Sequence, residues 1–142
     1  MKIVIDTNIV FSALLNPNSS ISKIILDSLN KFDFYSPKFI LEELVKHQSK
    51  ILEISGYSVR DLKILQAVLF KKITLVEMEF IRESTFKKAY ELTKGVDEDD
   101  TPFVALAMEL ESILWTGDKK LLNGLSKKGI DWVLTTDMIS RI

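Results

Sequence analysis

Two aspartates in this sequence each follow a short apolar segment that is typical of a buried strand. Asp6 ends the run at residues 3–5, and Asp118 follows the run at residues 113–115 after a short Thr116-Gly117 turn. Because the functional crevice of an open parallel sheet lies beyond the carboxyl ends of its strands, we expect both carboxylates at one edge. Capping of the helix that follows is the alternative role for each aspartate.

Further carboxylates lie in the acidic segment 97–100 and in the pair Glu42 and Glu43. Asp100 precedes the helix that a proline at position 102 is expected to open, where the helix dipole favours a negative charge. Asp97 lies three residues earlier, and it shares a face with Asp100 if this turn is already helical. Only one residue of the glutamate pair can face the sheet, and the pattern leaves the choice between Glu42 and Glu43 open.

Several carboxylates in one place predict a divalent metal site. Like charges raise one another's pKa values and resist simultaneous ionisation unless a cation neutralises them. Mg²⁺ and Mn²⁺ prefer oxygen ligands, and such an ion polarises a phosphoryl group and activates an attacking water. The acidic constellation therefore predicts phosphodiester hydrolysis without a protein nucleophile.

Strand-like and helical patterns alternate along the chain. Short apolar runs typical of strands occupy residues 3–5, 32–35, 73–76, 113–115 and 132–134. Helices are expected to begin at Ser20, at Ser36-Pro37, at Ser58, near Glu79, at Pro102 and after Asp118. The alternation predicts a three-layer α/β/α domain with a mostly parallel sheet of about five strands.

Composition narrows the class of protein. The 142 residues contain no cysteine and a single histidine, which excludes a disulfide framework and a thiolate zinc site. With 46% hydrophobic residues, the chain is expected to form a single domain over residues 1–142. The first residues are expected to form a strand rather than a signal peptide, and no apolar run is long enough to span a bilayer, so we expect a cytoplasmic protein without membrane association.

Four segments taken together resemble the PIN-domain nucleases. They are VIDTN at 4–8, ILEEL at 40–44, DEDDTPFVALA at 97–107 and WTGD at 115–118. The resemblance covers nearly the whole chain in order, and the combination is far more specific than any one motif. By this resemblance the catalytic acids are Asp6, Glu43, Asp100 and Asp118, and the metal ligands are Asp6, Asp97, Asp100 and Asp118. Thr7, Asn8 and Thr116 match the polar positions that accompany them.

The resemblance also implies an activity and partners. It implies an endoribonuclease that depends on Mg²⁺ or Mn²⁺, commonly a VapC-like toxin with an antitoxin protein as partner, and it implies a homodimer. An alternative is an RNA-binding or regulatory module that has no independent turnover. A phosphatase of another α/β fold is disfavoured, because residue 8 is Asn8 and not the second aspartate that aspartyl-phosphate enzymes use.

Two basic side chains near these acids are candidates for substrate contact. His47 lies four residues after Glu43, so one helical face can carry both, and a structural role is the alternative. Lys119 directly follows Asp118, where it can reach a phosphate, and an exposed first helical turn is the alternative. The net charge of -1 does not exclude nucleic-acid binding, because the lysines are clustered.

Overall fold

Five parallel strands form the sheet at the centre of the protein, in the order β3-β2-β1-β4-β5. The computed structural model describes residues 1–27, 29 and 31–142. The strands are β1 (Lys2–Ile5), β2 (Asp33–Pro37), β3 (Ile73–Val76), β4 (Ile113–Trp115) and β5 (Val133–Leu134). In the described chain every strand pair is parallel, as the alternation of strands and helices predicts. The predicted α/β/α fold with a parallel sheet is confirmed.

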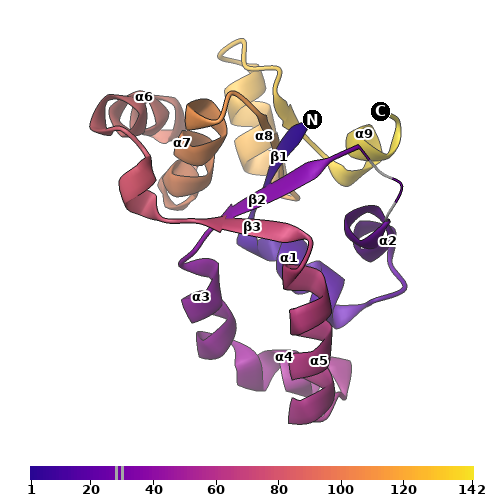
Figure 1. Cartoon of the computed structure of the whole chain (residues 1–142). Coiled ribbons are helices and arrows are strands. Elements are labelled where there is room, and N and C mark those ends of the chain that lie inside the picture. The colour runs from indigo at the N-terminus through magenta and orange to yellow at the C-terminus, as the bar shows by residue number, and fades with distance from the viewer. Residues whose placement is uncertain (28, 30) are drawn as a thin grey trace.

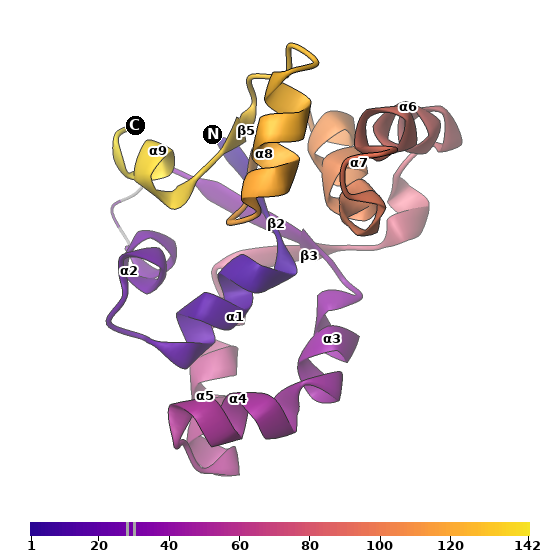
Figure 2. The same cartoon turned by 180° about the vertical axis from the view of Figure 1, so that it is seen from behind.

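Helices cover both faces of this sheet (Figures 1 and 2). They are α1 (Thr7–Leu15), α2 (Ser20–Leu26), α3 (Ile40–Lys46), α4 (Gln48–Ser55), α5 (Val59–Phe70), α6 (Glu83–Thr93), α7 (Thr101–Glu109), α8 (Lys119–Ser126) and α9 (Thr136–Ser140), with short 3₁₀ turns η1 (Met78–Phe80) and η2 (Glu98–Asp100). Helices α6, α7 and α8 lie on one side of the sheet, and α1, α2 and α5 lie on the other.

The central strand β1 divides the apolar interior into two cores. Ile3 and Ile5 point into the core formed with α1, α2 and α5, whereas Val4 points into the core formed with α6, α7 and α8. All three side chains are fully buried. A strand that is apolar on both faces is typical of a parallel sheet covered by helices, and it explains the uninterrupted apolar run before Asp6.

The predicted helix start at Ser36-Pro37 is wrong, because both residues belong to β2. Pro37 pairs with Val76 of β3, and the Ser36 hydroxyl donates a buried hydrogen bond to the carbonyl oxygen of Ile5 at 3.0 Å. The helix begins only at Ile40. These contacts to neighbouring strands prolong β2 beyond the point where the local sequence favours a helix.

Other helix boundaries shift by smaller amounts. The cap of α2 is Ser19 rather than Ser20, since the Ser19 hydroxyl accepts a hydrogen bond from the backbone N–H of Ser22. The segment predicted as one helix from residue 79 divides into η1 and α6. Gly95 follows the end of α6 with φ 75°, the left-handed conformation expected of a glycine that terminates a helix.

Within the described residues, no single helix is long and apolar enough to cross a bilayer. Helices α1 and α2 reach that length and composition together, but a bend of 104° separates them. Ile9, Val10 and Ile25 of these two helices are buried in the first core.

Candidate metal-binding acidic centre

The two strand-end aspartates lie at the same edge of the sheet. Ile5, the last residue of β1, lies opposite Trp115, the last residue of β4, so the chain leaves both strands at one level. Asp6 follows immediately, and Asp118 follows after two residues. This placement is the one expected for polar side chains at the carboxyl ends of adjacent parallel strands.

Asp6 caps α1 and is nearly fully buried, with 4% of its surface exposed. One carboxylate oxygen accepts a hydrogen bond from the backbone N–H of Ile9 at 2.9 Å, and the other accepts one from the Thr116 hydroxyl at 2.5 Å. Burial raises the pKa of Asp6 above its usual value, although the hydrogen bonds from Thr116 and Ile9 oppose this shift. Asp6 therefore caps α1, and it also lies near the other acids.

The hydroxyl of Thr116 joins the two strand ends. It donates to Asp6 and accepts a hydrogen bond from the backbone N–H of Asp118 at 3.0 Å. Asp118 in turn caps α8, because one of its carboxylate oxygens accepts a hydrogen bond from the backbone N–H of Leu121 at 3.1 Å. Thr116 is 1% exposed, so this bridge is shielded from water.

We expect Thr116→Val to lower the free energy of unfolding by about 1–3 kcal/mol, because it removes a buried donor to a carboxylate. The loss should grow as pH rises through the pKa of Asp6, since only the ionised carboxylate depends on that donor. Urea unfolding at several pH values measures the effect. Thr116→Ser keeps the hydroxyl and is the matched control; a loss in Thr116→Val that is no larger than the loss in Thr116→Ser would contradict a stabilising role for the hydroxyl bridge.

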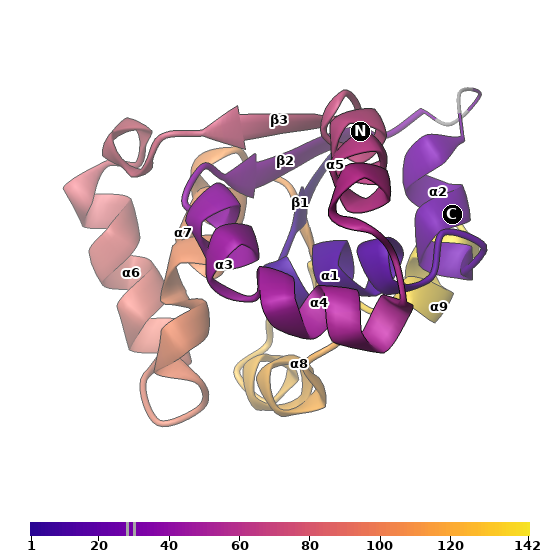
Figure 3. The same cartoon turned by 90° about the horizontal axis from the view of Figure 1, so that it is seen from below.

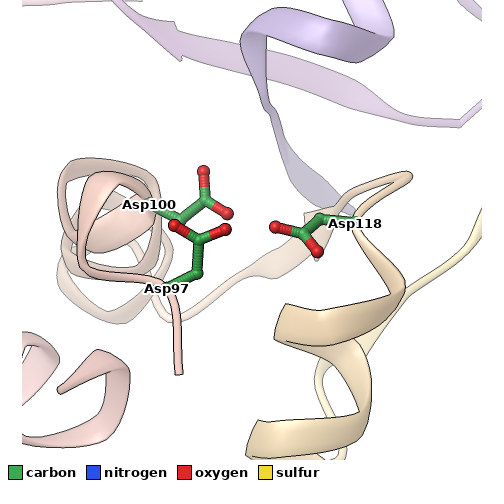
Figure 4. A group of neighbouring side chains, drawn as sticks. All are labelled: Asp97, Asp100 and Asp118. Atoms are coloured by element: carbon green, nitrogen blue, oxygen red, sulfur yellow. The ribbon is translucent and has the colours of Figure 1, made fainter. Parts of the chain in front are cut away.

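Asp97, Asp100 and Asp118 form the group that can hold a metal ion. Each offers one carboxylate oxygen, and the three oxygens lie within 4.8 Å of one another. Figure 4 shows the carboxylates of Asp97 and Asp100 turned toward that of Asp118 across the gap between two segments. The backbone N–H of Asp100 donates to the carbonyl oxygen of Asp97 at 3.2 Å, so the tight turn predicted from their spacing brings both side chains to one side.

The pKa values of these three aspartates are shifted because the carboxyl groups lie close together. Burial, the hydrogen bond to Asp118 and the charges of neighbouring aspartates raise the pKa of Asp100 to about 8. The hydrogen bond to Asp118, then burial, raises the pKa of Asp97. Burial also acts to raise the pKa of Asp118, but hydrogen bonds from Asp97, from the backbone N–H of Leu121 and from Asp100 outweigh it and lower that pKa. The raised pKa values of Asp97 and Asp100 mean that their ionised forms lack a positive partner, and an oxygen-preferring divalent cation would supply one.

Two buried threonines that sequence reasoning missed hold the acidic turn in place. The hydroxyl oxygens of Thr93 and Thr101 lie 2.6 Å apart, and the Thr101 hydroxyl donates to the carbonyl oxygen of Glu98 at 2.7 Å. Thr93 is fully buried and Thr101 is 4% exposed. The hydroxyl pair ties the end of α6 to the start of α7, and it therefore fixes the ends of the turn that carries Asp97 and Asp100.

Gly124 is a second feature that sequence reasoning missed, and it lets α8 approach the acidic turn. A Cβ at this position would lie 2.4 and 2.9 Å from the two Cγ atoms of Val96 and 3.2 Å from its Cβ. Rotation of the valine side chain cannot relieve these contacts, because its Cβ is itself too close. A larger residue would thus displace the backbone next to Asp97.

We expect Gly124→Ala to weaken Mn²⁺ binding by about 10–100-fold, the range seen when supports of a metal site are lost. Alanine is favoured over glycine within a helix by about 1 kcal/mol, so overall stability should fall little. Calorimetric titration with Mn²⁺ measures the affinity. Adding Val96→Ala should restore it by making room for the methyl group. Unrestored binding in the double variant would show that the contact with Val96 is not the cause.

Glu43 lies outside the group of three carboxylates. Its side chain is 40% exposed, and one of its oxygens lies 3.7 Å from Nε2 of His47. Both glutamates lie in the first turn of α3, where Glu42 is exposed and Glu43 is half-buried. The structure therefore places Glu43 and His47 together, as their spacing predicts, and the catalytic role of Glu43 stays a prediction.

The other predicted polar residues are neighbours of Asp6 and Asp118 in the sequence. Thr7 and Asn8 open α1 directly after Asp6, and the backbone N–H of Asn8 also stabilises the Asp6 carboxylate. Lys119 is exposed in the first turn of α8, beside Asp118. Their roles toward a substrate stay predictions.

Comparison with known proteins identifies the family. The PIN domain matches residues 4–138, a range that includes all the acids discussed above. The chain is 37% identical over 127 residues to the uncharacterized protein MJ1680 of Methanocaldococcus jannaschii. The aligned region covers 87% of this chain and 74% of that protein. The crystal structure of VapBC2 from Rickettsia felis, bound to a DNA fragment from its promoter, contains a similar chain with a TM-score of 0.59. At 14% identity, over 95% of this chain and 97% of that chain, this similarity concerns the fold. Because the family match extends over nearly the whole chain, the protein belongs to the PIN-domain family.

Proposed function

We propose that the protein is a divalent-metal-dependent endoribonuclease. PIN domains are generally nucleases. The observation that carries the proposal is the convergence of Asp97, Asp100 and Asp118, whose oxygens lie within 4.8 Å of one another at the carboxyl edge of the sheet. Hard oxygen donors in such a group suit Mg²⁺ or Mn²⁺ better than softer metals.

Different residues would bind the metal, orient the acids and contact the substrate in this reaction. Asp97, Asp100 and Asp118 would hold the cation, and Asp6 would add a fourth negative charge that Thr116 orients. When bound, the cation polarises the phosphoryl group and activates water. Lys119, which is exposed beside Asp118, would contact a phosphate of the RNA and contribute to substrate affinity.

The biological setting that we propose is a toxin paired with an antitoxin protein in the cytoplasm. Support comes from the structural likeness to a chain of the VapBC2 complex. We also propose a homodimer, as the family resemblance implies. Size-exclusion chromatography with light scattering tests the homodimer, and co-expression with the product of a neighbouring small reading frame tests the antitoxin.

Cleavage of a mixed pool of structured and unstructured RNA tests the function, with wild type and Asp6→Asn each in Mn²⁺, Mg²⁺ or EDTA. Asparagine can still accept the capping hydrogen bond from Ile9, so loss of activity would not reflect loss of α1. We expect cutting only with metal and only by wild type. Equal cutting by both proteins would exclude this site. Tight RNA binding without any cleavage would favour a regulatory RNA-binding module.

A further inference from the structure

A groove with a volume of about 500 Å³ runs between α1 and α4. Its α1 wall runs from Asn8 to Leu15, and its other wall runs from His47, just before α4, to Ile54. Figure 3 shows the two helices side by side. Asn8 is the second residue after Asp6, so the groove begins in the first turn of the helix that Asp6 caps.

The end of the groove near the acids has a chemistry suited to a nucleotide. The rings of Phe11 and His47 form a T-shaped pair with centroids 5.6 Å apart. The His47 side chain keeps 43% of its surface exposed, so this pair is open to solvent. Lys50 is exposed on the same wall, one helical turn beyond His47. Among the residues that the structure describes, it has no ion-pair partner.

We propose that this groove is a nucleobase subsite for single-stranded RNA, in which a base stacks against the Phe11–His47 pair and Lys50 contacts the neighbouring phosphate. Bases of any identity stack on aromatic side chains, and a cation beside them follows the backbone. The proposal rests on the proposed function, because the scissile phosphate would lie at the acidic centre. The Glu43 carboxylate lies 3.7 Å from His47, and in the part of the chain that the structure describes it forms no ion pair with Lys50.

Binding of a short labelled single-stranded RNA of mixed sequence in EDTA tests the subsite, with a matching sugar–phosphate strand that lacks bases as the second probe. We expect Phe11→Leu to weaken RNA binding by about tenfold and to leave binding of the abasic strand unchanged. Lys50→Gln should weaken both and should reduce the slope of log affinity against log salt by about 0.7. Tyr90→Leu on α6 and Lys71→Gln after α5 are matched controls that should bind like wild type.

A second variant separates stacking from folding, since Phe11 is partly buried. His47→Gln changes the more exposed member of the pair and should give a similar loss that is again specific to bases. Wild-type affinity in Phe11→Leu, His47→Gln and Lys50→Gln would overturn the proposal, and that result is also expected if the groove receives a protein segment. An absence of cleavage by wild type, with these binding losses intact, would overturn the nuclease assignment and retain the subsite.

Discussion

Asp118→Asn should lower the rate of RNA cleavage at saturating Mg²⁺ by about 10²–10⁴-fold. Asp118 is the one acid of the group whose pKa is lowered, so it is the first of the three to become ionised as pH rises. One of its carboxylate oxygens lies within 4.8 Å of oxygens of both Asp97 and Asp100. Neutralising Asp118 removes a full negative charge from the group that would bind a divalent cation.

The fold should survive this change, because asparagine caps helices as well as aspartate does. The acceptor for the backbone N–H of Leu121 is retained. Asp131→Asn is the matched control, since it makes the same charge change at an exposed position before β5, away from the acidic centre. Single-turnover cleavage of one defined RNA, with circular dichroism to confirm folding, measures the effect. A loss of less than about threefold in Asp118→Asn would contradict a metal-ligand role for this residue.

The strands could be predicted from the sequence because their signal is local. Runs such as Ile73–Val76 and Ile113–Trp115 consist mostly of β-branched or aromatic residues and are bounded by polar residues, and both have the predicted limits. The start of α3 could not be predicted, because Ser36 and Pro37 are drawn into β2 by contacts with β1 and β3. The break at His47, which separates α3 from α4, likewise has no proline or glycine that would indicate it.

The acidic centre could likewise be predicted from the sequence only in part. Asp6 and Asp118 could be found because each follows a strand directly or after a short turn. Asp97 and Asp100 could be linked because they lie three residues apart. What arranges these acids is contact between segments distant in sequence. The approach of Gly124 to Val96 and the Thr93–Thr101 hydroxyl pair have no local pattern, since a glycine in a helix indicates only weak helix propensity.

Asp100→Asn should make the metal-free protein more stable at pH 8 by about 2–4 kcal/mol, which is less than the full pKa shift would give because the side chain is partly solvated. The pKa of Asp100 rises from 3.8 to about 8 on folding. Between those values the unfolded chain has released the proton that the folded protein retains. The free energy of unfolding therefore falls as pH rises through this window. Asparagine carries no titrating proton, and its amide can donate hydrogen bonds to Asp97 and Asp118.

A divalent cation should reverse this order of stability. Mn²⁺ at about 1,000 times its dissociation constant would stabilise wild type by about 4.1 kcal/mol, because it binds the folded protein only. For a chain of this length, each kcal/mol corresponds to an increase of about 2–4 °C in Tm. The variant has lost one of the three carboxylates, so its Tm should respond weakly to the same addition.

Thermal unfolding at pH 5 and pH 8, with Mn²⁺ or EDTA, measures both effects in one series. Asp99→Asn is the matched control, since it removes the same charge from an exposed neighbour in the same turn. In EDTA, the advantage of Asp100→Asn should be small at pH 5 and large at pH 8, because the sign of the linkage makes wild type lose stability toward alkaline pH. A variant that is no more stable than wild type at pH 8, yet still gains stability with Mn²⁺, would mean that Asp100 neither holds a shared proton nor binds the metal. The same carboxyl group thus links the instability of the metal-free centre to its affinity for the cation.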